Sequence, residues 1–175
     1  MRSVAAAIPL LIPGVLLSAG IALLMAPRVA RALGTRTPVA FLLVMSVGSI
    51  VAITLTPHAT AIQEGAASDG VCDLSRWTPV PLDEMTRISS VTLNILLFIP
   101  LGMALGLLPR RGQTVGLILG AAMFPVIIEG TQLLAPALGR GCESADVVDN
   151  MLGLALGFAA GVTGRLLGVG RGAPG

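Results

Sequence analysis

Residues 129–161, EGTQLLAPALGRGCESADVVDNMLGLALGFAAG, decide the fold. Glu129 and Gln132 stand inside an apolar run, which a short polar loop follows. Polar residues and then glycines recur from there every three or four positions: Arg140, Glu143, Asp146, Asn150, Gly153, Gly157 and Gly161. Residues at this spacing share one helix face, and glycines let a neighbouring helix approach closely. The stretch therefore predicts a helix packed tightly on the third or fourth apolar segment of the chain, with polar side chains at one end.

The composition of the chain predicts an integral membrane protein. Of the 175 residues, 54% are hydrophobic and 11% are charged, and the mean hydropathy is +0.91. A soluble domain of this length would need a polar surface that these residues cannot supply. The net charge of +2 is too small and too scattered to indicate a nucleic-acid partner.

Five apolar segments are candidates for transmembrane helices. We expect these helices at residues 4–26, 39–55, 89–108, 113–134 and 147–167, in a single all-α membrane domain that covers residues 1–175. The first segment would also fit a cleaved signal peptide. Its apolar run is longer than the roughly 7–15 residues typical of signal peptides, so we favour a retained helix.

The distribution of charge predicts the orientation of this bundle. The loop at residues 28–36, the turn at Arg110 and Arg111, and the C-terminal tail carry Arg but no acid, whereas all nine acids lie between Glu64 and Asp149. Short loops that stay in the cytoplasm collect basic residues. We therefore expect the N-terminus outside and the C-terminus in the cytoplasm.

This topology gathers seven polar side chains at or near the outer membrane boundary: Asn94, Glu129, Gln132, Arg140, Glu143, Asp146 and Asn150. A carboxylate facing lipid at the depth of Glu129 would cost at least about 2–3 kcal/mol, so we expect it to face the bundle, with Arg140 as a bidentate partner. Polar groups of this kind often do no more than hydrogen-bond helices together. Two acids beside an Arg exceed what packing requires, and we favour a ligand-binding site made by all seven.

The two cysteines, Cys72 and Cys142, both fall in predicted outer loops. Oxidising conditions outside the cytoplasm favour their pairing. We expect a disulfide that fastens the long polar loop, residues 56–88, over the polar site. Two free thiols are the alternative.

Other kinds of site have little support in the sequence. A hard cation could be bound by four acids: Glu129, Glu143, Asp146 and Asp149. Their spacing is not diagnostic of a metal site, and the single His lies far from them in the sequence. Neither a Ser-His-Asp triad nor a phosphate-binding glycine loop is recognisable. We expect neither a metal nor a cofactor.

Three motifs together resemble the VanZ-like family: Asn94-Ile-Leu-Leu-Phe98-Ile-Pro100-Leu-Gly102, Glu129-x-x-Gln132, and Arg140-x-x-Glu143-x-x-Asp146-Val-Val-x-Asn150-x-x-Gly153-x-x-x-Gly157. The resemblance implies a small multi-pass protein of the bacterial plasma membrane. The family is named for a member of a glycopeptide-resistance cluster that raises tolerance to teicoplanin, which supplies a phenotype and not a reaction. By motif position it implies these signature residues: Asn94, Glu129, Gln132, Arg140, Asp146 and Asn150. Glu143 stands where the family commonly has Asp, and Asp149 stands where it is usually apolar.

Two functions of different classes fit these residues. The first is a non-enzymatic envelope protein, surrounded by membrane lipids, whose outer polar cleft binds an amphiphilic ligand, either a glycopeptide-type antibiotic or a lipid-linked wall component. The second is an intramembrane enzyme acting on a lipid-linked precursor, with Glu129 or Asp146 as general acid or base. A transporter is disfavoured, because the sequence has neither internal repeats nor a charged site at the membrane midplane. We favour the first function.

Overall fold

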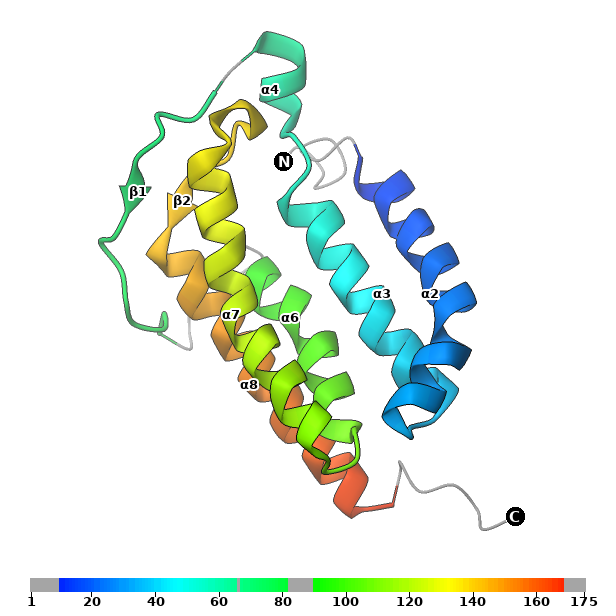
Figure 1. The fold of residues 1–175 in the computed structure, drawn as a ribbon. Helices are drawn as coiled ribbons and strands as arrows, with labels where there is room; N and C mark the ends of the chain where they lie inside the picture. Colours follow the sequence, from blue (N-terminus) through cyan, green and yellow to red (C-terminus); the bar gives the residue numbers. More distant parts are fainter. Residues whose placement is uncertain (1–9, 66, 82–89, 169–175) are drawn as a thin grey trace.

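The computed structural model describes residues 10–65, 67–81 and 90–168, and within them the chain is mostly helical (Figure 1). The elements follow in the order α2 (Leu11–Leu33), α3 (Thr37–Thr54), α4 (Ala59–Glu64), β1 (Cys72–Asp73), α6 (Ser90–Leu107), α7 (Gly112–Leu134), a 3-10 turn η1 (Pro136–Leu138), β2 (Cys142–Glu143) and α8 (Ser144–Leu166). Four helices of this described part are long and apolar enough to cross a membrane, and α6 is a shorter apolar helix. The predicted helical membrane architecture is confirmed as four candidate spans and one shorter apolar helix, to which the structure adds the two short strands β1 and β2.

The helix α6 lies inside the bundle and contacts α3, α7 and α8. Its side chains Phe98, Leu101 and Leu105 are almost fully buried, and Ile50 of α3 and Ile128 of α7 join them in the core. The helix α2 packs on α3 at the edge of the bundle (Figure 1). Many of its large side chains are exposed, as expected for a helix whose solvent is lipid.

The predicted glycine face of α8 is confirmed, and its partner is the third apolar segment, α6. A Cβ on each of three glycines would overlap the backbone of α6: Gly153 against Ile95, Gly157 against Ile99 and Gly161 against Met103. Gly102 and Gly106 of α6 meet the backbone of α8 in the same way. This close contact fixes α8 lengthwise on α6, and the polar end of α8 thereby lies beside Asn94.

The predicted end of the first helix at Ala26 is wrong. The helix continues through Pro27 to Leu33 and ends at Gly34, which has a left-handed backbone conformation with φ 61°. The apolar run does stop at Ala26, but the helix includes Arg28 and Arg31, and each of these side chains donates a hydrogen bond to a carbonyl four residues earlier. Most of the predicted 28–36 loop is therefore helical. The predicted start of that helix, residues 4–9, lies outside the described residues.

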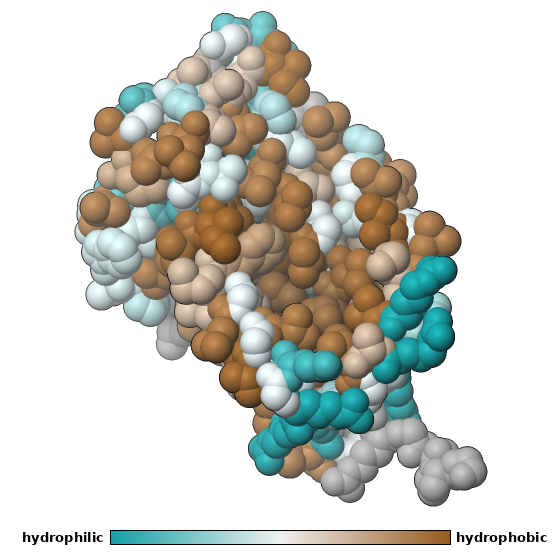
Figure 2. Space-filling view, viewed as in Figure 1, coloured by the Kyte–Doolittle hydropathy of each residue, from teal (hydrophilic) through white to brown (hydrophobic). Residues whose placement is uncertain are grey.

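The two ends of the bundle differ in their charged residues, because the acids of the described part all lie at one of them. Five arginines lie where α2 ends, α7 begins and α8 ends: Arg28, Arg31, Arg110, Arg111 and Arg165. Figure 2 shows hydrophilic side chains at this lower end of the molecule. The acids of the described residues lie at or beyond the opposite ends of α7 and α8, or in the loops there. We call these the arginine end and the disulfide end.

Candidate functional site

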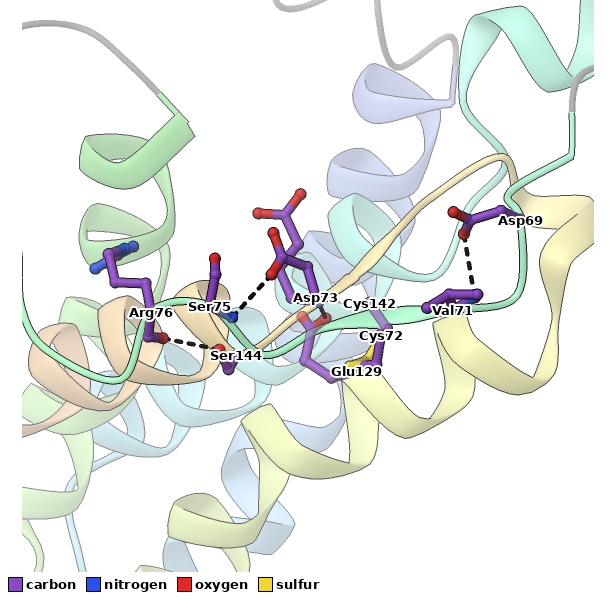
Figure 3. The surroundings of a disulfide bond; sticks show 10 residues. Asp69, Val71, Cys72, Asp73, Ser75, Arg76, Glu129, Cys142 and Ser144 are labelled. Carbon is purple, nitrogen blue, oxygen red and sulfur yellow. Dashed lines mark hydrogen bonds between the residues drawn. A yellow bond between two sulfur atoms is a disulfide. The ribbon is translucent and has the colours of Figure 1, made fainter.

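A disulfide fastens residues 67–81, here called the strap, to the start of α8. Cys72 and Cys142 are bonded, with their Cα atoms 4.5 Å apart, which confirms the predicted pair. The flanking residues form a short parallel ladder in which Asp73 pairs with Glu143. Figure 3 shows the strap running alongside β2, with Glu129 beside the disulfide.

An ion pair provides a second attachment of the strap. Arg76 donates from Nη2 and Nη1 to the two carboxylate oxygens of Asp149, at 2.6 and 3.2 Å. Asp149 is completely buried in α8, and this hydrogen bonding raises the pKa of Arg76. Ser144 Oγ also donates to the carbonyl of Arg76 at 2.8 Å (Figure 3). No sequence pattern indicated Arg76 as a partner; the available signal was Asp149 itself, an acid at a position that is usually apolar in the family.

Glu129 has a different partner from the one expected. Its side chain is only 4% exposed, and Oε2 accepts a hydrogen bond from the backbone N–H of Glu143 at 2.8 Å. Glu143 is the N-cap of α8, where backbone N–H groups lack partners within the helix and a negative charge is stabilised. The disulfide anchors β2, which contacts α7 and thereby brings this N–H to Glu129. The predicted bidentate Glu129–Arg140 pair is replaced by this contact.

Arg140 and Gln132 instead bind the carbonyl groups at the end of α3. Arg140 Nε donates to Thr56 O at 3.0 Å, and Gln132 Nε2 donates to Thr54 O at 2.9 Å. Carbonyls at a helix C-terminus lack partners within the helix and attract cations. Both contacts tie α3 to the α7 side of the bundle, so hydrogen bonding between helices accounts for part of what these two residues do.

The guanidinium of Arg140 retains a buried nitrogen, Nη2, that has no hydrogen-bond partner. Burial lowers the pKa of Arg140, and the nearby carboxyl groups of Asp146 and Glu129 act in the opposite direction. An arginine in this position is close to two acids without donating to either in the structure.

The first turns of α8 supply the remaining polar groups. Asn94 of α6 lies close to the side chain of Asp146 across the α6–α8 contact. Asn150, one turn further, is 2% exposed, and its Oδ1 is a buried acceptor without a partner. The structure thus places six of the seven predicted side chains in the polar layer at the disulfide end: Asn94, Glu129, Gln132, Arg140, Asp146 and Asn150. The seventh, Glu143, is exposed and contributes its backbone N–H.

This layer, together with Arg76 and Asp149, is the candidate site. It offers three carboxyl groups, of which that of Asp149 is already paired with Arg76, together with a buried guanidinium N–H and a buried amide oxygen. Within residues 10–65, 67–81 and 90–168, no group of three or more His, Cys, Asp or Glu side chains is placed to hold a metal ion. The chemistry it can support is hydrogen bonding and charge pairing with a polar group, or proton transfer by a carboxyl group.

Comparison with protein families gives a match to the family described as VanZ/LLP1 over residues 36–165. The chain belongs to the VanZ-like family. The matched region begins just before α3 and ends in the last turn of α8, so it includes every residue of the candidate site, with the strap and its two attachments. The helix α2 lies outside it. Comparisons with curated proteins and with solved structures gave no match.

Proposed function

We propose that the candidate site of this VanZ-like membrane protein binds the polar headgroup of an amphiphilic molecule, either a glycopeptide-type antibiotic or a lipid-linked wall component. The observation that carries the proposal is the pair of unmatched atoms, Arg140 Nη2 and Asn150 Oδ1. A buried donor and a buried acceptor without partners each cost about 1–3 kcal/mol, which a ligand that bonds both would recover. The apolar helices around the site offer a surface for the rest of such a molecule.

The proposal includes the orientation with the disulfide end outside the cytoplasm. Two independent features support it. Arginines without acids occupy the opposite end, as in loops retained in the cytoplasm. A disulfide persists where conditions are oxidising, which the bacterial cytoplasm is not. A reporter fused after Gly175 is expected to be active in the cytoplasm, and activity outside it would reverse the orientation and remove the proposed access to envelope ligands.

The binding test compares the oxidised protein with two Arg variants in lipid nanodiscs. Teicoplanin and a lipid-linked peptidoglycan precursor are titrated separately by calorimetry. Arg140→Ala should weaken binding about tenfold or more, because a hydrogen bond to a charged group contributes about 1.5–3 kcal/mol. Arg110→Ala is the matched control at the arginine end and should bind as the unmodified protein does. Equal affinities in all three proteins would contradict the proposal.

The alternative is an intramembrane enzyme, favoured by the placement of Glu129 and Asp146, on two different helices, near Arg140. Turnover separates the two functions. If the labelled lipid-linked precursor is converted to a product by the unmodified protein and not by Glu129→Gln, the site is catalytic. Saturable binding without product is the result expected from the proposal.

A further inference from the structure

A second, apolar feature of the molecule lies away from the candidate site. A groove of about 610 Å³ opens between α3 and α7, with Leu101 and Leu105 of α6 at its floor and the last turns of α2 at its side. Figure 2 shows it as a hollow of hydrophobic side chains facing the viewer, with hydrophilic side chains along its lower rim. Its volume falls within the range of about 300–1,000 Å³ that is usual for small-molecule sites. The groove therefore has room for a ligand and presents it with apolar walls.

Two glycines of α7 keep this groove open. Gly116 and Gly120 line it, and a Cβ built on either meets no atom within 4 Å. The glycines of α8 at the same spacing, such as Gly157, are in contact with the backbone of α6. The glycine stripe of α8 is thus covered by α6, whereas the glycine stripe of α7, Gly116 and Gly120, faces open space.

The groove ends beside positive charge. Arg111 immediately precedes α7, and its guanidinium lies against Gly34, the residue that follows groove-lining Leu33 at the end of α2. Arg110 is adjacent, and the sequence has no acid between Glu84 and Glu129 or before Glu64. The apolar chain of a ligand bound in the groove would therefore place the ligand's polar end group next to these arginines.

We propose that this groove binds an acyl chain of an anionic diacyl phospholipid, whose phosphate is held by Arg111 at the arginine end. The apolar walls of the groove would contact the acyl chain. The guanidinium of Arg111 would bind the phosphate, for which its planar set of donors is well suited. Basic side chains at a membrane surface attract anionic lipid by about 1 kcal/mol each. This inference does not depend on the proposed headgroup site, which lies at the other end of the bundle.

A second copy of the chain is the competing occupant, because glycines spaced four apart often support helix pairing in membranes. A symmetric pair within one membrane would have its axis along the membrane normal, and the same ends of both copies would then lie together. Arg110 and Arg111 of the two copies would face each other with no acid between them. Charge therefore favours the anionic lipid over self-association.

The test uses photoreactive acyl chains on two lipids, phosphatidylglycerol and phosphatidylcholine, each added to vesicles of phosphatidylethanolamine that contain the full chain. The labelled peptide is identified by mass spectrometry. Phosphatidylglycerol should label the groove walls several times more strongly than phosphatidylcholine. Arg111→Gln should lower the phosphatidylglycerol signal about fivefold, to near that of phosphatidylcholine.

Two variants fill the groove from opposite walls, and one control leaves it open. Gly120→Leu on α7 and Val47→Trp on α3 should each remove most of the labelling by both lipids. Gly20→Leu is the control, because Gly20 also faces open space but lies outside the groove. Arg140→Ala should leave lipid labelling unchanged even if headgroup binding is lost. Labelling that persists in both filled variants would overturn the proposal, as would cross-links joining two copies through α7.

Discussion

The completely buried carboxylate of Asp149 on α8 and the guanidinium of Arg76 on the strap form a two-point ion pair, although 73 positions separate them in the sequence. Removing one partner of a buried ion pair typically costs about 3–5 kcal/mol, because the other charge stays buried. We expect Arg76→Ala to lower the melting temperature in detergent clearly more than Arg76→Ala/Asp149→Leu, which removes both charges. The measurement is thermal unfolding followed by circular dichroism. Equal losses in the two variants would show that the ion pair contributes little.

The disulfide is expected to protect both cysteines from thiol reagents. Unreduced protein should take up no maleimide, and protein reduced in denaturant should take up two per chain. The bond spans 70 positions, and closing a loop of that length stabilises the folded state by at most about 4 kcal/mol. Cys72→Ser/Cys142→Ser should therefore melt at a lower temperature while keeping its helix content. Ready labelling of both cysteines before reduction would contradict the structure.

The two glycine stripes should respond in opposite ways to alanine. Gly157→Ala places a Cβ against the backbone of Ile99, which cannot move without separating α8 from α6. A destabilisation of about 1–3 kcal/mol or more is expected. Gly116→Ala meets open space, and it should be neutral or stabilising by about 0.5–1 kcal/mol because alanine is the better helix former. Thermal unfolding of the two single variants is the measurement, and similar effects at both sites would contradict the assigned packing.

The contact between Glu129 and the backbone of Glu143 predicts a graded response at position 129. Glu129→Gln keeps an oxygen that can accept the N–H, so the loss of stability should be small. Glu129→Leu removes the acceptor of this N–H and should cost about 0.5–1.5 kcal/mol, the usual net contribution of one hydrogen bond. Backbone amide exchange at Glu143 reports the bond directly and should accelerate in the Leu variant only. Unchanged exchange in that variant would show that another group accepts the N–H.

The structural features that could be predicted from the sequence are those that depend directly on the type of side chain. Apolar runs predicted the helices, and the spacing of Gly153, Gly157 and Gly161 predicted the face of α8 that packs on α6. The Cys72–Cys142 bond followed from the number and placement of cysteines. In each case the residue type itself restricts the structure, by its solvent preference, its size or its redox chemistry.

The partners of the polar residues were harder to predict, because several of them are backbone groups. Glu129 binds the N–H of Glu143, and Arg140 binds the carbonyl of Thr56, and neither acceptor nor donor has a signature in the sequence. The sequence also could not show that the arginine paired with an acid is Arg76 and not Arg140, because this depends on where the strap lies. That position follows from the disulfide and could be deduced only after the fold was known.

The bond between Cys72 and Cys142 also has a consequence for how the protein is made. In the proposed orientation, α6 and α7 cross the membrane as a hairpin, so Cys72 leaves the ribosome first and Cys142 reaches the same side of the membrane only after that hairpin is inserted. The thiol of Cys72 therefore cannot form this disulfide until that insertion is finished. Closure of the disulfide during biosynthesis thus marks the moment at which the α6–α7 hairpin is completely inserted.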